Sequence, residues 1–184
     1  LGYDYLDTGA LYRAVALSLL KDGVNENNIN ENQAIKCAST LDLTLLNSPQ
    51  IRSDPVANLA SKIAVLQPVR AKLLSLQRGF AESPPSAKGA VLDGRDIGTV
   101  VLPEAERKFF IDANIDIRAH RRTKELRQSG QSVMFRDILA DLKARDERDR
   151  SRSASPMRAA DDAIAIDTSK LDADSVLALA LTYI

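Results

Sequence analysis

The chain is poor in the residues that form disulfides, metal clusters and stacking platforms. It has one cysteine, Cys37, and one histidine, His120, and aromatic residues make up 4% of its 184 positions. A single cysteine excludes an internal disulfide, and no group of residues has the spacing of a metal cluster. We expect Cys37 in the core and His120 on a helix surface, so no histidine-based acid or base is predicted. Few aromatic side chains leave few platforms for nucleic-acid bases.

The chain also has no excess of either charge and no long apolar run. The 25 Lys+Arg balance the 25 Asp+Glu, whereas a dedicated nucleic-acid binder usually has a basic excess. No apolar run reaches the roughly 18 residues of a transmembrane candidate. Hydrophobic residues make up 45% of the chain, which is enough for a proper core. Length and composition predict one domain, with room for a small insert.

Strand-like and helix-like segments alternate along the chain. The helix over 10–22 carries the apolar stripe Leu11, Val15 and Leu19, which is typical of one buried helix face. We expect further helices over 33–40, 116–128 and 135–150, and over 56–76 with a break before Pro68. We expect strands ending at Tyr5–Leu6 and over 41–46, 89–92, 108–111 and 163–166. Strands separated by helices predict a parallel α/β sheet with right-handed crossovers.

The most informative block is residues 91–99, Val-Leu-Asp-Gly-Arg-Asp-Ile-Gly-Thr. An apolar strand here runs directly into Asp93, Arg95 and Asp96, and open α/β sheets bind ligands at this end of their strands. Buried charges without partners are very costly. The three charges therefore either form an ion-pair network or serve a ligand. In the second case Arg95 holds a phosphate, one aspartate reads a base or amine, and another positions Mg²⁺ through water.

Two other segments allow a similar choice. Asp7-Thr8-Gly9 opens a helix, where the dipole and free N–H groups favour an anion within reach of Arg13. The alternative is an ordinary capped helix with an exposed arginine. In the run 145–152, Arg145, Asp149 and Arg152 share one helix face. This run is either a solvated face with salt bridges or a phosphate site, because arginine suits bidentate phosphate contacts. The small-residue loop at 151–156 suits a movable edge.

Taken in order, these motifs resemble those of the bacterial cytidylate kinases. The matching segments are Leu6–Arg13, Asp93–Val101, Arg118–Arg122, Arg145–Arg152, Ser155–Pro156, Ala160–Ile164 and Ile166–Thr168. The resemblance implies a P-loop nucleoside monophosphate kinase with an α/β fold, a parallel-sheet core and helices on both faces. It implies one kinase domain: a CORE at about 1–30, 86–120 and 158–184, a nucleoside-monophosphate-binding insert at about 31–85, and a LID at about 121–157.

The resemblance also implies an activity and its partners. The enzyme would transfer the γ-phosphoryl group of ATP to CMP or dCMP, giving CDP or dCDP in pyrimidine nucleotide metabolism, with Mg²⁺ accompanying ATP. We expect a cytoplasmic monomer that binds no specific nucleic acid and no membrane.

Matching motif to motif assigns roles to single residues, all of them implied by the resemblance. The cytosine ring would meet Thr8, Ser61, Arg70 and Asp96, with Arg152 close by. Asp149 would hold the sugar hydroxyls, and the CMP phosphate would be gripped by Arg13, Arg95 and Arg145. ATP phosphates would meet Arg148 and Arg121 or Arg122. Asp7 and Asp93 would lie near the reacting phosphates and Mg²⁺, with no side chain as a direct metal ligand. The catalytic set is expected to be Arg95, Arg145, Arg148 and Asp93.

The sequence departs from the family pattern in two places. The Gly-rich GxxxxGK[ST] loop that cradles ATP phosphates does not occur in these 184 residues. We therefore expect the native protein to have a first segment outside this sequence. The 184 residues alone should lack kinase activity, and the native upstream segment should restore it. The second departure lies in the insert, where only residues 47–50 separate Leu41–Leu46 from Ile51–Ser53. The family's small β-hairpin is either reduced here or omitted from the sequence.

Two alternatives stay open at this point. The first is another P-loop small-molecule or nucleotide kinase, such as a relative of adenylate or shikimate kinase, and the order of the motifs argues against it. The second is a catalytically incompetent fragment that binds nucleotides or RNA, which the arginine-rich run and the missing loop would suit. Zero net charge and sparse aromatics argue against the second alternative.

Overall fold

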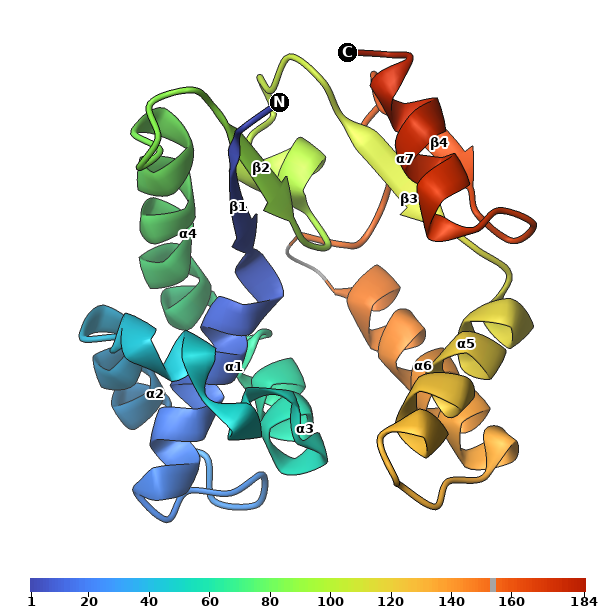
Figure 1. The fold of residues 1–184 in the computed structure, drawn as a ribbon. Helices are drawn as coiled ribbons and strands as arrows, with labels where there is room; N and C mark the ends of the chain where they lie inside the picture. The colour runs from blue at the N-terminus through green and yellow to red at the C-terminus, as the bar shows by residue number, and fades with distance from the viewer. Residues whose placement is uncertain (153–154) are drawn as a thin grey trace. The chain divides into compact units, whose positions relative to one another are not determined.

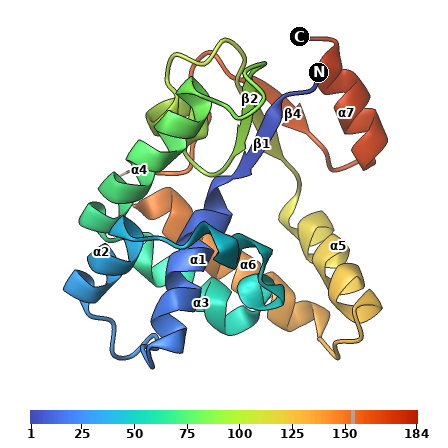
Figure 2. The ribbon, with the colours of Figure 1, turned by 60° about the vertical axis from the view of Figure 1, so that its left-hand side comes forward.

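The computed structural model describes residues 1–152 and 155–184 and divides into two compact units, Leu1–Ile97 and Gly98–Ile184. The helices and strands of the first unit are β1 (Asp4–Asp7), α1 (Thr8–Lys21), α2 (Glu31–Ser39), α3 (Asp54–Ile63), α4 (Gln67–Glu82) and β2 (Ala90–Asp93). Strand β1 leads straight into α1, and α4 returns to β2 (Figures 1 and 2). β1 and β2 pair in parallel, from Asp4 opposite Ala90 to Asp7 opposite Asp93.

The core of the first unit forms around one face of α1. Leu11, Val15 and Leu19 of α1 are completely buried, as their spacing predicts, and α1 packs against α3. On α3, Val56 and Ile63 are fully buried as well. Burying a side chain of this size contributes about 1.5–3 kcal/mol. This packing therefore fixes α1, and with it the end of β1.

The strand expected over 41–46 is wrong. The chain forms two short 3-10 helices instead, Leu43–Asn47 and Pro49–Arg52. The Asp42 side chain accepts hydrogen bonds from the backbone N–H of Thr44 at 2.9 Å and from its hydroxyl at 2.6 Å. Such local bonds compete with a strand ladder, and Pro49 supplies no N–H for one. Residues 41–53 thus form turns, and they contain no β-hairpin of the kind found in the family.

The helical break before Pro68 is confirmed. α3 ends at Ile63, and α4 begins at Gln67 with Pro68 in its first turn. The backbone N–H groups of a first turn have no partner within the helix, so a proline costs no helical hydrogen bond there. Arg70 consequently lies in the first turns of α4 and Ser61 near the end of α3. The short connection brings the end of α3 and the start of α4 together, and Arg70 bonds to the carbonyl of Ala64 at the end of α3.

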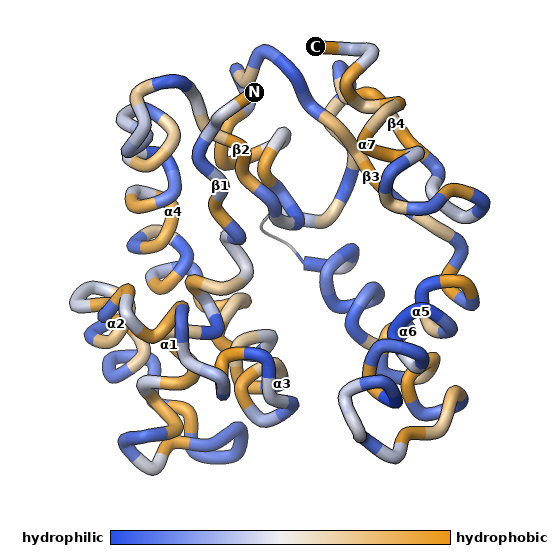
Figure 3. Tube along the Cα trace, in the orientation of Figure 1, coloured by the Kyte–Doolittle hydropathy of each residue, from blue (hydrophilic) through white to orange (hydrophobic). Residues whose placement is uncertain are grey.

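The second unit contains β3 (Phe109–Asp112), α5 (Ile115–Gln128), α6 (Phe135–Ser151), β4 (Ile164–Asp167) and α7 (Ala173–Leu181), and a π-helical turn at Ile97–Val101 stands at the boundary. β3 and β4 pair in parallel, from Phe109 opposite Ile164 to Asp112 opposite Asp167. α5 and α6 pack together, and α6 is largely hydrophilic (Figure 3). The parallel α/β architecture predicted from the sequence is confirmed in both units.

Three smaller expectations can be compared with the structure. His120 is exposed on α5, as expected, and stacks on Phe135 with ring centroids 4.3 Å apart. Cys37 is half-buried against the core of the first unit, so the prediction of a core thiol holds only in part. Within the described residues, no helix combines the length and the apolar character that crossing a membrane requires.

Candidate active site

Two carboxylates meet where the strands of the first unit end. Asp7 and Asp93 are the last paired residues of β1 and β2. Asp7 also caps α1, because its side chain accepts a hydrogen bond from the N–H of Ala10 at 3.0 Å. The next residue, Thr8, is buried and donates from its hydroxyl to the carbonyl of Asp93 at 2.7 Å. The predicted turn into α1 and the end of β2 are thereby joined.

The carboxyl of Asp93 has a shifted pKa. Loss of solvation around the carboxyl raises its pKa, although the residue as a whole is exposed, and the negative charge of Asp7 raises it further. The positive charge of Arg95 acts in the opposite direction, which places this guanidinium within electrostatic reach of Asp93. Carboxylates that crowd each other in this way favour a cation between them or nearby.

Asp96 has a well-defined partner in Arg70. Nη2 of Arg70 lies 2.5 Å from Oδ2 of Asp96, and the two side chains are only 11% and 12% exposed. Nη1 of Arg70 donates to the carbonyl of Ala64 at 3.2 Å, and its guanidinium lies 5.9 Å from the ring centroid of Tyr12. The end of α3, the start of α4 and the Asp93–Asp96 block therefore converge on one charged pair.

Two further predicted residues lie in the same unit. Arg13 of α1 donates from Nη1 to the carbonyl of Ile51 at 3.4 Å, which ties it to the 3-10 turn of the insert. The hydroxyl of Ser61 is buried and has no hydrogen-bond partner within the described residues. A buried hydroxyl without a partner costs free energy.

In the second unit, the predicted face of α6 is confirmed. Arg145 lies 3.8 Å from Asp149 through Nε and Oδ2, and Arg152 forms an ion pair with the same carboxylate. Asp149 is only 2% exposed, whereas the Arg145 side chain is 41% exposed. Arg148 is exposed and donates from Nε to the carbonyl of Ala144 at 3.2 Å. The spacing i, i+4, i+7 thus places two arginines around one buried carboxylate.

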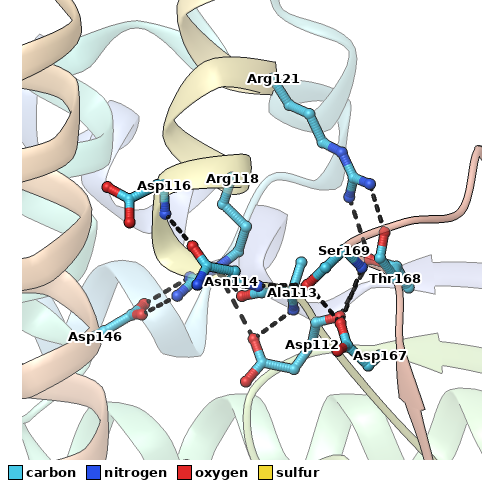
Figure 4. Close-up of polar contacts among 10 residues, drawn as sticks. All are labelled: Asp112, Ala113, Asn114, Asp116, Arg118, Arg121, Asp146, Asp167, Thr168 and Ser169. Carbon is cyan, nitrogen blue, oxygen red and sulfur yellow. Dashed lines mark hydrogen bonds and ion pairs between the residues drawn. The ribbon is translucent and has the colours of Figure 1, made fainter.

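The two arginines expected near ATP differ in their surroundings. Arg121 donates to the hydroxyl and carbonyl of Thr168, at 3.1 and 2.5 Å, and to the carbonyl of Leu171 at 3.0 Å (Figure 4). Arg122 forms an ion pair with Glu125 at 3.0 Å and remains 37% exposed. In the structure Arg121 therefore holds the loop after β4, whereas Arg122 bonds within its own helix. Residues 153–154 of the predicted movable loop lie outside the described residues.

A second concentration of polar groups lies at the ends of β3 and β4 (Figure 4). These strands end on a second pair of facing aspartates, Asp112 and Asp167, beside an open cavity of about 770 Å³. On its far side Arg118 of α5 pairs with Asp146 of α6 at 2.5 Å. Sequence reasoning assigned no role to these residues. The signal that could have located them is that β3 and β4 each end on an aspartate.

Gly94 was also missed as a residue with a role of its own. A Cβ at this position would overlap the hydroxyl of Thr8 and approach Cδ1 of Ile97 to 2.7 Å. The close approach of Thr8 to the end of β2 therefore requires a glycine between Asp93 and Arg95. The signal was available in the Asp-Gly-Arg-Asp block, but which atoms crowd the glycine depends on the fold.

The chain is similar to known proteins along its whole length. The family model described as cytidylate kinase matches residues 1–184. A cytidylate kinase from Paramagnetospirillum magneticum is 48% identical over 184 residues, which cover 100% of this chain and 86% of that protein. The cytidylate kinase of Rhodospirillum rubrum is 46% identical, covering 98% and 84%, and that of Bartonella bacilliformis is 46% identical, covering 99% and 82%. With nearly half of its residues shared along its whole length, the chain belongs to the cytidylate kinase family.

Proposed function

We propose that this protein transfers the γ-phosphoryl group of ATP to CMP or dCMP and forms CDP or dCDP. Family membership over the whole chain supports the reaction class. The observation that carries the choice of acceptor is the Arg70–Asp96 pair, held at the carboxyl end of β2 beside the end of α3. A paired carboxylate and guanidinium present acceptors and donors together, as a cytosine ring requires.

Cytosine recognition follows from the hydrogen-bonding pattern of the base. Its N4 amino group needs an acceptor, and Asp96 keeps carboxylate lone pairs beyond the one that Arg70 uses. Its O2 and N3 need donors, which Arg70 and the partnerless hydroxyl of Ser61 can supply. Thr8 lies near the end of β2, and we propose that Arg152 lies beside the cytosine ring. Uracil presents O4 where cytosine has N4, and that oxygen would face a carboxylate.

The remaining parts of CMP are anionic or polar. Arg13, Arg95 and Arg145 are proposed to hold its phosphate, because charge-assisted contacts from arginine can be bidentate. Asp149, which pairs with Arg145 and Arg152, would accept hydrogen bonds from the sugar hydroxyls. Arg148 and Arg122 are proposed to meet the ATP phosphates. We give Arg121 a smaller part there, since its donors already serve backbone carbonyls.

The facing carboxylates Asp7 and Asp93 fit an accompanying Mg²⁺. The raised pKa of Asp93, caused by loss of solvation and by the charge of Asp7, supports the proposal of a cation nearby. Mg²⁺ prefers oxygen and keeps several of its waters, so one or two carboxylates suffice when phosphates supply the other ligands. Bound there, the ion would neutralise phosphate charge. We propose contact through water, with no side chain as a direct metal ligand.

Catalysis would then depend on placement more than on covalent chemistry. Phosphoryl transfer needs the two substrates aligned and their charges neutralised. Arg95 stands at the end of a strand, where its backbone is rigid, and holds the acceptor phosphate. Arg145 and Arg148 stand on α6, which belongs to the proposed LID region. Mutual repulsion between these cations would favour an open LID until anionic substrates enter and water is excluded. We place this activity in a cytoplasmic monomer.

A panel of phosphoryl acceptors tests the proposal. The native protein is incubated with ATP and Mg²⁺ and with CMP, dCMP, UMP, AMP or shikimate, and products are separated by chromatography. CDP and dCDP should form fastest. Preference for AMP or shikimate would establish the alternative of another P-loop kinase. Absence of any phosphorylation together with RNA binding would establish the binding-fragment alternative.

A further inference from the structure

An ion pair between a buried aspartate and a half-buried arginine joins α5 and α6 in the second unit. Asp146 of α6 is only 4% exposed and accepts hydrogen bonds from Arg118 of α5 on both carboxylate oxygens, at 3.1 Å and 2.5 Å. This is the bidentate fork in which arginine fixes orientation as well as charge. Bonding to Asp146 is also the main reason that the pKa of Arg118 is raised. The guanidinium stays charged at any pH at which the protein is folded.

The other edge of the same guanidinium holds the end of β3. Nε of Arg118 donates to the carbonyl of Ala113 at 3.0 Å and lies 3.8 Å from Oδ1 of Asp112 (Figure 4). Ala113 directly follows the last residue of β3. Arg118 therefore bridges two elements at once, the strand end on one side and α6 on the other. A lysine could replace the charge but not this planar bridge.

Asp146 is well placed to control the site face of α6. It follows Arg145 by one residue and precedes Asp149 by three, so it lies about 100° from Arg145 and about 60° from Asp149 around the helix. The bond from Arg118 therefore reaches α6 beside the face that carries Arg145 and Asp149. A helix held at its flank by a two-pronged bond cannot rotate about its own axis without breaking that bond.

We propose that Arg118 is a positioning residue: by its fork to Asp146 it sets the rotation of α6 and so the placement of Arg145 and Asp149 for the acceptor nucleotide. This inference rests on the proposed function of those two residues. Apolar replacements of a buried ion pair are often neutral for stability. A fork kept at this position is therefore better explained by the geometry that it imposes than by the stability that it adds.

A double-mutant cycle tests the positioning role. Arg118→Met is combined with Arg145→Ala, and separately with Arg13→Ala, and kcat/KM is measured for the acceptor that the wild type phosphorylates best. A misplaced side chain can cost up to about 100-fold in rate, so Arg118→Met should lower kcat/KM by roughly 10- to 100-fold. Arg145→Ala should then cost much less in the Arg118→Met background than in the wild type. Arg13 stands on α1, so its loss should remain additive.

Two controls separate positioning from folding. Arg118→Lys should restore part of the melting temperature that Arg118→Met loses. It should not restore the lost kcat/KM, because a lysine cannot bridge both elements. Arg136→Met, an exposed arginine at the start of α6, should leave both quantities unchanged. Additive losses with Arg145→Ala, or a lowered melting temperature with unchanged kcat/KM, would overturn the inference. A wild type that prefers an acceptor other than CMP would overturn the proposed function instead, and the cycle would be run on that acceptor.

Discussion

Asp96 has a part in the fold besides its proposed contact with the base. Its carboxylate holds Arg70, and Arg70 in turn reaches the carbonyl of Ala64 and the ring of Tyr12. Removing the carboxylate charge would therefore affect both the base contact and the guanidinium. The two effects can be told apart, because only the first distinguishes one pyrimidine from another.

Asp96→Asn should weaken the discrimination between CMP and UMP. The amide keeps the size of the side chain but can turn its NH₂ toward the O4 of uracil. A site built around one polar group rejects a mismatch sharply, so the CMP:UMP ratio of kcat/KM should fall by about tenfold or more. Steady-state kinetics on both acceptors at saturating ATP–Mg²⁺ measure it, with Asp162→Asn, an exposed partner of Lys108, as the control. An unchanged ratio would leave Asp96 as an ion-pair partner only.

Arg95→Ala and Arg145→Ala should weaken the use of CMP more than the use of ATP. Each change removes a charge-assisted contact with the acceptor phosphate, worth roughly 1.5–3 kcal/mol. The corresponding loss in kcat/KM for CMP is about 10- to 100-fold, while KM for ATP should change much less. Initial rates over a grid of both substrate concentrations give the two constants. Equal losses for CMP and ATP would contradict the assignment to the acceptor.

Asp93 should make folding stability depend on pH. Its pKa is raised in the folded protein by loss of solvation and by Asp7, so the folded state binds this proton more readily than the unfolded chain. The free energy of unfolding should therefore fall as pH rises from the ordinary aspartate range through the raised pKa. Asp93→Asn removes this pH dependence. The free energy of unfolding of the variant relative to the wild type should therefore increase over the same pH range.

Urea unfolding from about pH 4 to about pH 7 measures this difference. Asp167→Asn is the matched control at the end of β4, because hydrogen bonds from Ser169 lower the pKa of Asp167. Its contribution has the opposite sign: the stability that Asp167 adds is lost as pH falls through its lowered pKa. A pH-independent difference for Asp93→Asn would show that its carboxyl titrates normally.

At the scale of elements, periodic apolar stripes made the helices predictable, and short apolar segments were less reliable. The stripe of Leu11, Val15 and Leu19 identified α1 because all three side chains are buried together. Residues 41–46 carry similar apolar side chains, but the bonds from the Asp42 side chain to Thr44 decide their conformation. Such a local bond competes with a ladder bond, and a hydrophobic pattern does not reveal it.

For the candidate site, the sequence revealed charged blocks and pairs within one helix, but not the pairs between distant segments. The Asp93–Asp96 block could be recognised from charges at the end of an apolar strand. Sequence could not show that Asp96 pairs with Arg70, 26 residues away, or that Arg118 pairs with Asp146, 28 residues away. Partners at such separations are set by helix packing, and every arginine in the chain is an equal candidate until the helices are placed.

Gly94→Ala should destabilise the junction between β2 and α1. The added Cβ would overlap the Thr8 hydroxyl and approach Ile97, and both side chains have little freedom to move. We therefore expect the free energy of unfolding to fall by about 1–3 kcal/mol, the typical cost of overpacking. Urea denaturation measures the loss. Gly79→Ala within α4 is the control, since nothing lies near its Cβ position and alanine should stabilise the helix by about 0.5–1 kcal/mol. Equal stability of Gly94→Ala and the wild type would contradict the crowding.

At the scale of the whole molecule, the proposed roles are divided between the two units. The base contacts belong to Leu1–Ile97, where Arg70 and Asp96 lie, and the sugar contact belongs to Gly98–Ile184, where Asp149 lies. The first unit has a broad apolar core, whereas Asp146 and Asp149 of the second unit are buried charges. The buried residues of α6 are these two aspartates alone, and a helix with few buried apolar contacts has low local stability, so the second unit should gain more order than the first from an added ligand.

CMP should therefore protect helices in both units from hydrogen exchange. At about 100 times its dissociation constant, a ligand that binds only the folded protein adds about 2.7 kcal/mol to the free energy of unfolding. Amides of α4 should slow through the contacts of Arg70, and amides of α6 through those of Arg145 and Asp149, with the larger change in α6. Exchange monitored by mass spectrometry, with UMP at the same concentration as control, resolves the two helices. Since UMP should be rejected at Asp96, it should protect both helices less. Protection by CMP confined to α4 would remove Arg145 and Asp149 from the acceptor site, and protection confined to α6 would remove Arg70 and Asp96.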